Sequence, residues 1–417
     1  MDPMSDDAMY MGAIPQHPVE TVGTTFESLG LDPPLLETLE AIAFRHPTKI
    51  QAAVIPIALE GRDVVGLAMT GSGKTAAFVL PLAQRLYHGE GVRGLILSPT
   101  REIALQTKAF LDIFGRDHDL RSACLIGGVA YGPQLKDLRH GPDIVVATPG
   151  RLLDHVERRN VRLGAIEELV IDEADHMLDL GFMPQVQRVL ELLPRERRTM
   201  LFSATMPEPV ERLANRFLND PVRVDLRPGT RAALGIEHEL YLVHRDDKKQ
   251  ACMALLRKET GSTLVFTRRK IDAEWLARAL HREGFSVARI HGDLSQSQRV
   301  QALDGLRRGE HRILVATDVA ARGIDIPVIE HIINFDLPEA VEDYIHRAGR
   351  TARGAAEGVV SSIATWKDKP FLKELESALG QPLPRLQVGS VEPYEELRTH
   401  RPTGDLRKGK TKFRRKL

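Results

Sequence analysis

The stretch GLAMTGSGKT, residues 66–75, decides the fold because a glycine-rich loop in it joins an apolar run to a helix-forming segment. Gly71, Ser72 and Gly73 let backbone amides surround a phosphate group, and the dipole of the following helix strengthens the attraction. A strand, a loop of this type and a helix in succession are a unit from which parallel sheets are built. The stretch therefore predicts a phosphate-binding loop in a protein of alternating strands and helices.

The polar residues around this loop predict its chemistry. In loops of this kind the lysine, here Lys74, reaches the β- and γ-phosphates, and the hydroxyl of Thr75 is offered to Mg²⁺. Asp172 and Glu173 follow the apolar run LVI. A carboxylate at a strand end holds the metal directly or through water, and its neighbour orients or deprotonates the attacking water. We therefore expect Lys74, Asp172 and Glu173 to be catalytic, with Thr75 and Asp172 serving the metal.

Composition narrows the class of protein. The 417 residues are 42% hydrophobic and 27% charged, as in ordinary globular chains, and allow two or three domains. No apolar run is as long as a membrane span, and the first residues lack the order of a signal peptide. Cys124 and Cys252 do not form a CxxC pair, which argues against a zinc site or a disulfide framework. We therefore expect a cytoplasmic protein that makes no contact with a membrane.

The charges are balanced overall but unevenly distributed. Residues 1–44 hold eight acidic residues and no Lys or Arg, whereas the last twenty residues hold nine basic residues. A basic end of this kind suits a flexible arm that binds a polyanion. A solvated, disordered end without a partner explains the same composition, and both interpretations stay open.

The pattern of strand and helix repeats along the chain in two sets. Because the apolar runs are hydrophobic throughout, they indicate parallel sheets covered on both faces. The first set lies at 63–69, 94–100, 143–150, 168–175 and 199–205, and the second at 262–267, 286–292, 312–318, 329–336 and 358–364. The fold class expected is therefore α/β, with two tandem domains, each a mainly parallel sheet with helices on both faces.

A turn-rich stretch separates the two sets and fixes the expected domains. They are an acidic, disordered extension at 1–23, a nucleotide-binding domain at 24–222, a linker at 223–235, a second domain at 236–385 and a basic, flexible tail at 386–417. Most apolar runs end in polar or glycine-rich residues, and ligands of parallel sheets bind at the carboxyl ends of strands. Two such edges that face each other predict a cleft between the domains.

The second domain supplies positive charge for this cleft. The stretch YIHRAGRTARG at 344–354 places Arg347, Arg350 and Arg353 three residues apart, largely on one face of a helix or turn. Facing a nucleotide, these side chains would neutralise the charge of a transferring phosphoryl group, as an arginine finger does. Because they lie on the other domain, hydrolysis would require the two domains to close.

At this point the chain resembles a known family, the DEAD-box ATP-dependent RNA helicases of superfamily 2, and we expect a bacterial member. The resemblance runs from Phe26 to about residue 364, and its motifs occur in the family's order. They are FRHPTKIQ (44–51), AMTGSGKT (68–75), PTREIALQ (99–106), GG (127–128), TPGR (148–151), DEAD (172–175), SAT (203–205), LVFTRRK (264–270), HGDLSQSQR (291–299), ATDVAARGID (316–325) and HRAGRTAR (346–353).

The resemblance implies two RecA-like domains, ATP and Mg²⁺ as cofactors and RNA as substrate. Gln51 has a carboxamide that donates and accepts at once, which matches adenine N6 and N7, and Phe26 would stack on the ring. The implied ATP-binding residues are Phe26, Gln51, Ala68, Met69, Thr70, Gly71, Ser72, Gly73, Lys74, Thr75, Gly323 and Asp325. The implied catalytic residues are Lys74, Asp172, Glu173, Arg350 and Arg353.

The same resemblance assigns residues to RNA and to the coupling of the two sites. The implied RNA-binding residues are Thr100, Arg101, Gly128, Thr148, Arg151, Arg268, Thr317 and Arg322. Contacts of this kind hold the sugar-phosphate backbone without reading its sequence. The residues implied to couple ATP and RNA are Asp175, Ser203, Thr205 and His346.

The chain departs from the family pattern at a few positions. Met69 stands where Gln is common, and Ala43 stands where Gly is usual before the aromatic residue. Ile103, Ala348 and Ala352 also differ from the family pattern. None of these changes removes a catalytic group.

These observations predict an ATP-dependent RNA helicase that clamps single-stranded RNA and ATP between its domains and locally separates duplexes or remodels RNA–protein complexes. The same motifs would serve an ATP-gated RNA clamp that unwinds little. A DNA-directed helicase of related architecture is a further alternative, which stimulation by DNA equal to that by RNA would favour. A small-molecule kinase is a more distant alternative, because it has no need of the motifs of the second domain.

Overall fold

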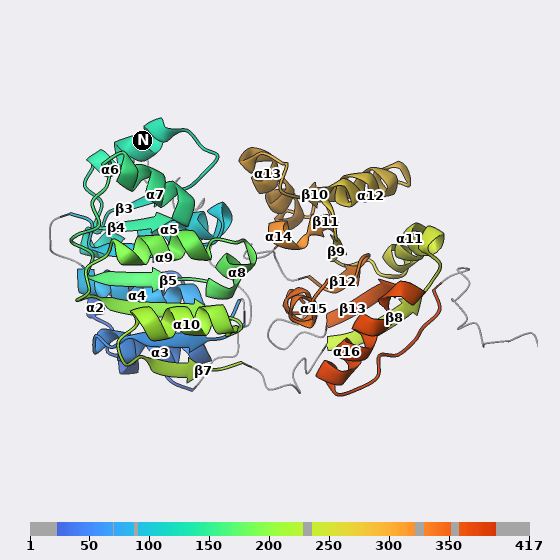
Figure 1. Cartoon of the computed structure of the whole chain (residues 1–417), viewed down its shortest axis with the longest axis horizontal. Coiled ribbons are helices and arrows are strands. Elements are labelled where there is room, and N and C mark those ends of the chain that lie inside the picture. Colours follow the sequence, from blue (N-terminus) through green and yellow to red (C-terminus); the bar gives the residue numbers. More distant parts are fainter. Residues whose placement is uncertain are drawn as a thin grey trace, which may run out of the picture.

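The computed structural model describes residues 23–69, 71–86, 91–227, 236–321, 329–351 and 358–388. Within these ranges the chain forms two α/β units that lie side by side (Figure 1). Single turns of 3₁₀ helix occur at Glu27–Leu29, Arg116–His118, Arg245–Asp247 and Trp366–Asp368.

The first unit is built on a sheet for which seven strands are described, in the order β3-β4-β2-β5-β6-β1-β7. Every described pair of neighbouring strands in it is parallel. The strands are β1 (Val64–Leu67), β2 (Gly94–Leu97), β3 (Ser122–Leu125), β4 (Ile144–Ala147), β5 (Glu168–Ile171), β6 (Arg198–Ser203) and β7 (Val222–Asp225).

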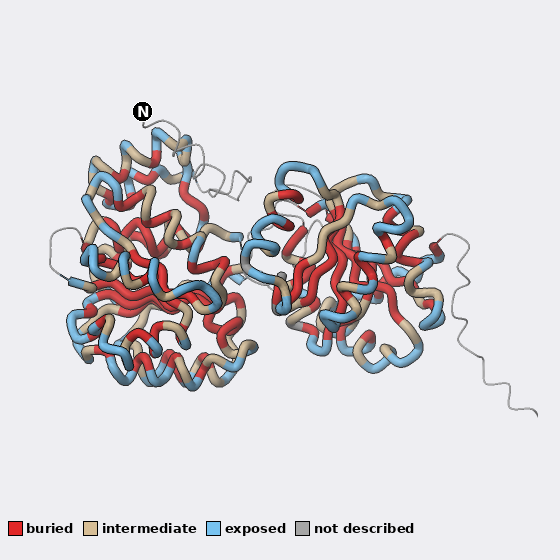
Figure 2. The backbone as a smooth tube through the Cα atoms, turned by 90° about the horizontal axis from the view of Figure 1, so that it is seen from above, coloured by how far each residue is buried: buried red, intermediate tan, exposed pale blue. Residues whose placement is uncertain are grey.

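Helices cover both faces of this sheet. They are α2 (Pro33–Ala41), α3 (Lys49–Leu59), α4 (Lys74–Leu86), α5 (Arg101–Phe114), α6 (Tyr131–Arg139), α7 (Pro149–Glu157), α8 (Ala174–Asp179), α9 (Met183–Glu191) and α10 (Glu208–Phe217). Consecutive strand residues point to opposite faces, so Val64 packs in one apolar core and Val65 in the other. Apart from the edge strand β7, the strands are therefore largely buried on both sides, as their uninterrupted hydrophobicity predicts (Figure 2).

The second unit repeats this architecture with six described strands in the order β10-β11-β9-β12-β13-β8, again parallel at each described pair. The strands are β8 (Ile236–Leu242), β9 (Thr263–Thr267), β10 (Val287–Ile290), β11 (Ile313–Thr317), β12 (His331–Asn334) and β13 (Gly358–Ala364). The helices are α11 (Lys248–Lys258), α12 (Lys270–Arg282), α13 (Gln296–Arg307), α14 (Asp318–Ala321), α15 (Val341–Ala348) and α16 (Lys369–Leu379). The fold class expected from the sequence is confirmed.

The ends of the two units reach slightly beyond the expected domain boundaries. β7 pairs with β1 in the first sheet, so that sheet continues to Asp225, past residue 222. After α16 the chain returns beside β8, where Leu386 N donates to Leu240 O at 2.8 Å, and Val388 is buried in the second unit. The expected linker at 223–235 and the basic tail lie largely outside the described residues.

The carboxyl ends of the strands carry the polar residues singled out in the sequence. Asp172 follows β5, Ser203 ends β6, Arg268 follows β9 and Thr317 ends β11. In Figure 1, α8 lies on the side of the first unit that faces α13, α14 and α15 of the second. The two chemistry-bearing edges thus approach each other, as the polar strand ends predict.

Two further features concern the length of the helices and the state of the cysteines. Among the described residues, no helix has the length and apolar character needed to cross a bilayer. Cys124 and Cys252, both in the described part of the chain, are buried free thiols. Burial raises the pKa of each thiol to about 12, so neither is a reactive thiolate at neutral pH.

Asp63 joins three segments of the first unit and provides a test of the fold. Its buried carboxylate accepts hydrogen bonds from Thr199 N at the start of β6 and from Asn219 N before β7, each at 2.7 Å. Replacement by alanine leaves two backbone donors without an acceptor, which is expected to lower the free energy of unfolding by about 1–3 kcal/mol. Urea denaturation of the full chain measures this loss. Glu196→Ala, at an exposed position, is the control, and equal midpoints for the two variants would contradict the assignment.

Candidate nucleotide and RNA site

The phosphate-binding loop is shaped by residues from the start of α3. Gln51 Nε2 donates to Gly73 O at 3.0 Å, while Gln51 Oε1 accepts from Thr48 N at 2.9 Å and closes a capping box. Gly73 has φ +93°, and a Cβ at this position would lie 2.5 Å from Gln51 Nε2. Glycine is therefore required at position 73 both by the backbone conformation and by the space that Gln51 occupies.

This arrangement modifies the role expected for Gln51. The side chain is fully buried and holds the loop, a contact that the sequence did not predict. A carboxamide has two N–H donors and two lone pairs, so one of each is left for an adenine. Phe26, expected to stack on the base, is 3% exposed, and its ring stacks on the more exposed ring of Phe44 at a centroid distance of 5.7 Å.

Lys74 is buried at the start of α4, directly after the loop. Its Nζ donates to Ala68 O at 3.0 Å, and its charge favours ionisation of both Asp172 and Glu173. Thr75, the next residue, is partly exposed. Lys74 therefore connects the phosphate loop with Asp172 and Glu173, the two carboxylates that follow β5.

Asp172 and Glu173 are adjacent and buried, and their surroundings push their pKa values in opposite directions. Burial raises the pKa of Asp172, and the negative charge of Glu173 raises it further. Burial also opposes ionisation of Glu173, but a hydrogen bond with His176 and the positive charges of His176, Lys74 and Arg350 outweigh it and lower the pKa. Glu173 is thus the carboxylate that stays ionised.

The position of Glu173 depends on a strained backbone and on His176. Glu173 has φ +50° and ψ +57°, a left-handed conformation that is uncommon for a residue other than glycine. It precedes α8, and His176 lies three residues later with its Nδ1 3.1 Å from Glu173 Oε2. Sequence reasoning missed His176, although its spacing of three residues from Glu173 across a helix start was a usable signal.

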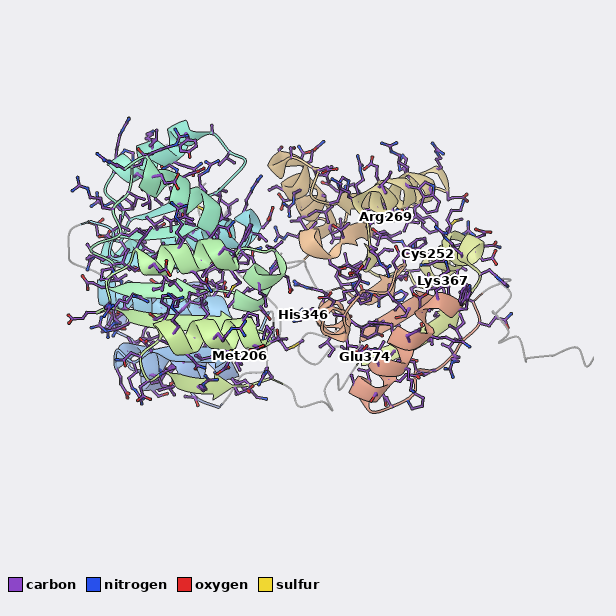
Figure 3. The ribbon with its side chains drawn as sticks, in the orientation of Figure 1. Met206, Cys252, Arg269, His346, Lys367 and Glu374 are labelled. Atoms are coloured by element: carbon purple, nitrogen blue, oxygen red, sulfur yellow. The ribbon has the colours of Figure 1, made fainter. Side chains whose placement is uncertain are left out.

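Asp175 joins α8 to the end of β6. Its Oδ2 accepts hydrogen bonds from Ala204 N at 3.1 Å and from Thr205 N and Oγ1 at 2.8 and 3.0 Å, while Asp175 N donates to Ser203 Oγ at 3.2 Å. His346 of α15 places Nε2 4.0 Å from the same oxygen. Figure 3 shows His346 on the side of the second unit that faces the first. The structure therefore brings together the four residues expected to couple the sites.

The described arginines that were expected to face the nucleotide, Arg347 and Arg350, make different contacts. Arg350 is 4% exposed and close enough to Glu173 for its charge to lower the pKa of that carboxyl group. Arg347 turns into the second unit instead, where it makes a bidentate ion pair with Asp318 and donates to Asn334 Oδ1 at 2.8 Å. The expectation that Arg347 faces the nucleotide is wrong, because these acceptors are available only inside its own unit.

Several expected site residues fall outside the described part of the chain. They are Thr70, Arg322, Gly323, Asp325 and Arg353.

The residues expected to bind RNA in the first unit gather at neighbouring strand ends. Thr100 caps α5 through a bond from Ile103 N at 3.3 Å, and the guanidinium of Arg101 lies against Gly128, where a Cβ would collide with it. Arg151 donates to Val129 O at 3.2 Å and stacks over the Tyr131 ring. Thr148 begins α7 beside them. These cationic and polar groups form one partly exposed edge.

The second unit contributes two described residues of this set. Arg268 is exposed after β9, and its Nη2 donates to Leu337 O at 3.0 Å. Thr317 is buried at the end of β11. The side chain of Arg268 is therefore accessible from the solvent, whereas that of Thr317 is covered.

An ion pair connects α5 of the first unit with α13 of the second. Arg299 Nη1 of α13 lies 3.0 Å from Glu102 Oε1 of α5, and both side chains are largely buried. Sequence reasoning missed the pair because its members are 197 positions apart and belong to different units. Together with the contacts of His346 and Arg350, it shows that the carboxyl edges of the two sheets meet.

Comparison with known proteins agrees with this geometry. The family model for DEAD/DEAH box helicases matches residues 48–213, and the model for the helicase conserved C-terminal domain matches residues 247–355. The chain is 42% identical to the ATP-dependent rRNA helicase RRP3 of Candida albicans, over 90% of this chain and 71% of that protein. It is 38% identical to the DEAD-box ATP-dependent RNA helicase CshA of Bacillus cereus, over 88% of this chain and 71% of that protein.

Solved structures give the same answer. The chain superposes on S. cerevisiae Dbp5 bound to RNA and ADP BeF3 with a TM-score of 0.79 and 31% identity, covering 87% of this chain and 95% of that one. Sequence family, fold and the arrangement of the motifs at the facing sheet edges therefore agree, and the chain belongs to the DEAD-box family of ATP-dependent RNA helicases.

Proposed function

We propose that this helicase hydrolyses ATP between its two units and uses the cycle to bind single-stranded RNA and separate short duplexes. One observation carries the proposal. Arg350 and His346 of the second unit lie within electrostatic reach of Glu173 and Asp175 of the first. Groups from both units therefore complete one site, and ATP turnover depends on their approach.

ATP is held mainly by the first unit. The loop from Ala68 to Thr75 surrounds the phosphates, and Lys74 exchanges its bond with the Ala68 carbonyl for the β- and γ-phosphates. Gln51 offers its remaining donor and acceptor to the adenine, beside the Phe26–Phe44 pair. Glu173, kept ionised by His176, orients and deprotonates the attacking water, and Arg350 and Arg353 neutralise charge on the phosphoryl group.

The residues at the end of β5 suit Mg²⁺. Asp172 Oδ1 is buried and has no hydrogen-bond partner among the described residues, and burial raises the pKa of this carboxyl group. A divalent cation there would satisfy the oxygen and offset the cost of burying its charge. Asp172 and Thr75 would hold the ion, which usually keeps several waters and binds substrate phosphates. The ion would neutralise charge between the β- and γ-phosphates.

RNA binds along the facing edges through its backbone. Arg101, Thr148 and Arg151 supply contacts from the first unit, and Arg268 and Arg322 supply contacts from the second. Because these groups meet phosphate and sugar, binding is largely independent of sequence. A strand held across both edges must follow their shape, and a bend there prevents pairing with a complementary strand. Asp175, with Ser203, Thr205 and His346, links this edge to the ATP carboxylates.

The setting proposed for this activity is the cytoplasm. Two buried free thiols without a disulfide suit a reducing compartment. The basic tail, which lies outside the described residues, is proposed as a further arm for RNA, and loss of 398–417 is expected to reduce the salt dependence of RNA binding.

ATP hydrolysis by the purified chain tests the proposal directly. We expect stimulation by single-stranded RNA and little by DNA of the same sequence. Lys74→Ala is expected to abolish turnover, and Arg350→Ala is expected to lower kcat much more than it raises the KM for ATP, because the arginine acts on the transition state. Equal stimulation by DNA, or unchanged turnover in either variant, would refute the assignment. Release of a labelled strand separates unwinding from a long-lived clamp.

The pH dependence of hydrolysis tests the role of His176. Its hydrogen bond helps to lower the pKa of Glu173, so the carboxylate remains ionised as the pH falls. In His176→Ala this support is lost and the pKa rises, so activity is expected to fail at a higher pH on the acidic side. A profile of kcat against pH at saturating RNA measures the displacement. His140→Ala, at an exposed position, is the matched control, and identical acidic limbs in all three proteins would exclude the role.

A further inference from the structure

Met69, the departure from the family pattern within the phosphate loop, makes a specific contact with the second unit. A Cβ placed on Gly349 would lie 2.7 Å from the terminal methyl carbon of Met69. The methyl group therefore rests directly on the Gly349 backbone. Gly349 immediately precedes Arg350, so the contact lies one residue from the guanidinium that acts on Glu173.

The backbone of Gly349 gives no other reason for a glycine. Its φ of −66° is available to every residue, and its N donates to Ile345 O at 2.9 Å at the end of α15. The other atoms near a Cβ at this position are Ile345 O at 3.5 Å and His346 O at 3.7 Å, which are ordinary contacts. Among the described neighbours, the methyl of Met69 is thus what limits the space at position 349.

The turn that carries Arg350 is rigid on its own side. Arg350 N donates to Arg347 O at 3.0 Å, and the Arg347 side chain is fixed by Asp318 and Asn334. Met69, in contrast, is partly exposed and has an unbranched, flexible side chain. When the units approach, the thioether is the adjustable member of the contact, and its length sets how closely the loop and the turn can come together.

We propose that Met69 is a positioning residue that seats the Gly349–Arg350 turn against the phosphate loop and so sets the reach of Arg350 to the phosphates. The inference rests on the proposed function of Arg350. The contact is apolar, between a methyl group and a glycine backbone, so it needs no hydrogen-bond partner, whereas a carboxamide at position 69 would need one when the units close. The apolar side chain of Met69 therefore lies between the phosphate loop and the Gly349–Arg350 turn.

The experiment is a double-mutant cycle on the full chain, with Met69→Ala, Gly349→Ala and the two together. A misplacement of about 1 Å at a catalytic group can cost a large factor in rate, so we expect Met69→Ala to lower kcat on the order of tenfold. Gly349→Ala is expected to have a smaller effect, because the flexible end of Met69 can move away from the new Cβ. The KM for ATP is expected to change little, because the loop itself is intact. In the double variant the new Cβ occupies the space that the methionine has left, so kcat is expected to recover above that of Met69→Ala.

Two further measurements keep the cycle decisive. Met69→Leu retains an apolar side chain of similar volume and is expected to give a higher kcat than Met69→Ala. Thermal unfolding of each variant checks that the differences in rate do not come from loss of structure. Strictly multiplicative losses in the double variant, or a lower kcat for Met69→Leu than for Met69→Ala, would overturn the proposal.

The outcome is separable from that of the proposed function. If the parent chain shows no RNA-stimulated hydrolysis, the proposed function fails. If the parent chain hydrolyses ATP and the two substitutions act independently, the role of Met69 fails while the function stands.

Discussion

The proposed ATP and RNA sites both depend on the carboxylate of Asp175, which faces groups of both units. One oxygen gathers the backbone of residues 204 and 205 and the hydroxyl of Thr205, and the same oxygen faces His346 of the second unit. A buried carboxylate needs several donors to offset its loss of hydration. Those donors lie at the end of β6. A displacement of that segment would therefore move Asp175 and, with it, Glu173 two residues earlier in the chain. The proposed coupling therefore rests on shared hydrogen bonds.

The opposite pKa shifts of Asp172 and Glu173 show how two neighbouring carboxyl groups acquire different properties. Both are buried at the end of β5, but only Glu173 has His176 as a hydrogen-bond partner. The strained left-handed backbone at Glu173 turns its side chain from the strand direction into the start of α8. Asp172, which lacks this partner, keeps an oxygen that suits a cation. In the proposed mechanism, this local change of backbone direction separates the base from the metal ligand.

The sequence predicts most of this fold because the central strands are buried on both faces and their hydrophobic runs are unbroken. The expected runs do not include the edge strands β3, β7 and β8, of which β7 and β8 alternate apolar and polar residues. The position of the site follows from the polar residues at strand ends, as Asp172 and Ser203 illustrate. What could not be predicted is the choice of partner for long side chains. Arg347 was expected in the cleft but turns toward Asp318, and Gln51, expected to face the base, holds the Gly73 carbonyl. These outcomes depend on which acceptors lie nearby in space, and a spacing of three residues carries no such information.

The ion pair between Glu102 and Arg299 gives the two main steps different sensitivities to salt. The arginines proposed to meet RNA phosphates, such as Arg101 and Arg151, are partly exposed, so their attraction for phosphate is screened by ions and by competing counterions. The pair between the units is largely buried and is screened much less. Raising the ionic strength therefore loosens the grip on the strand before it weakens the joining of the units. The ionic strength of the solution thus becomes a means of separating substrate capture from domain closure in this molecule.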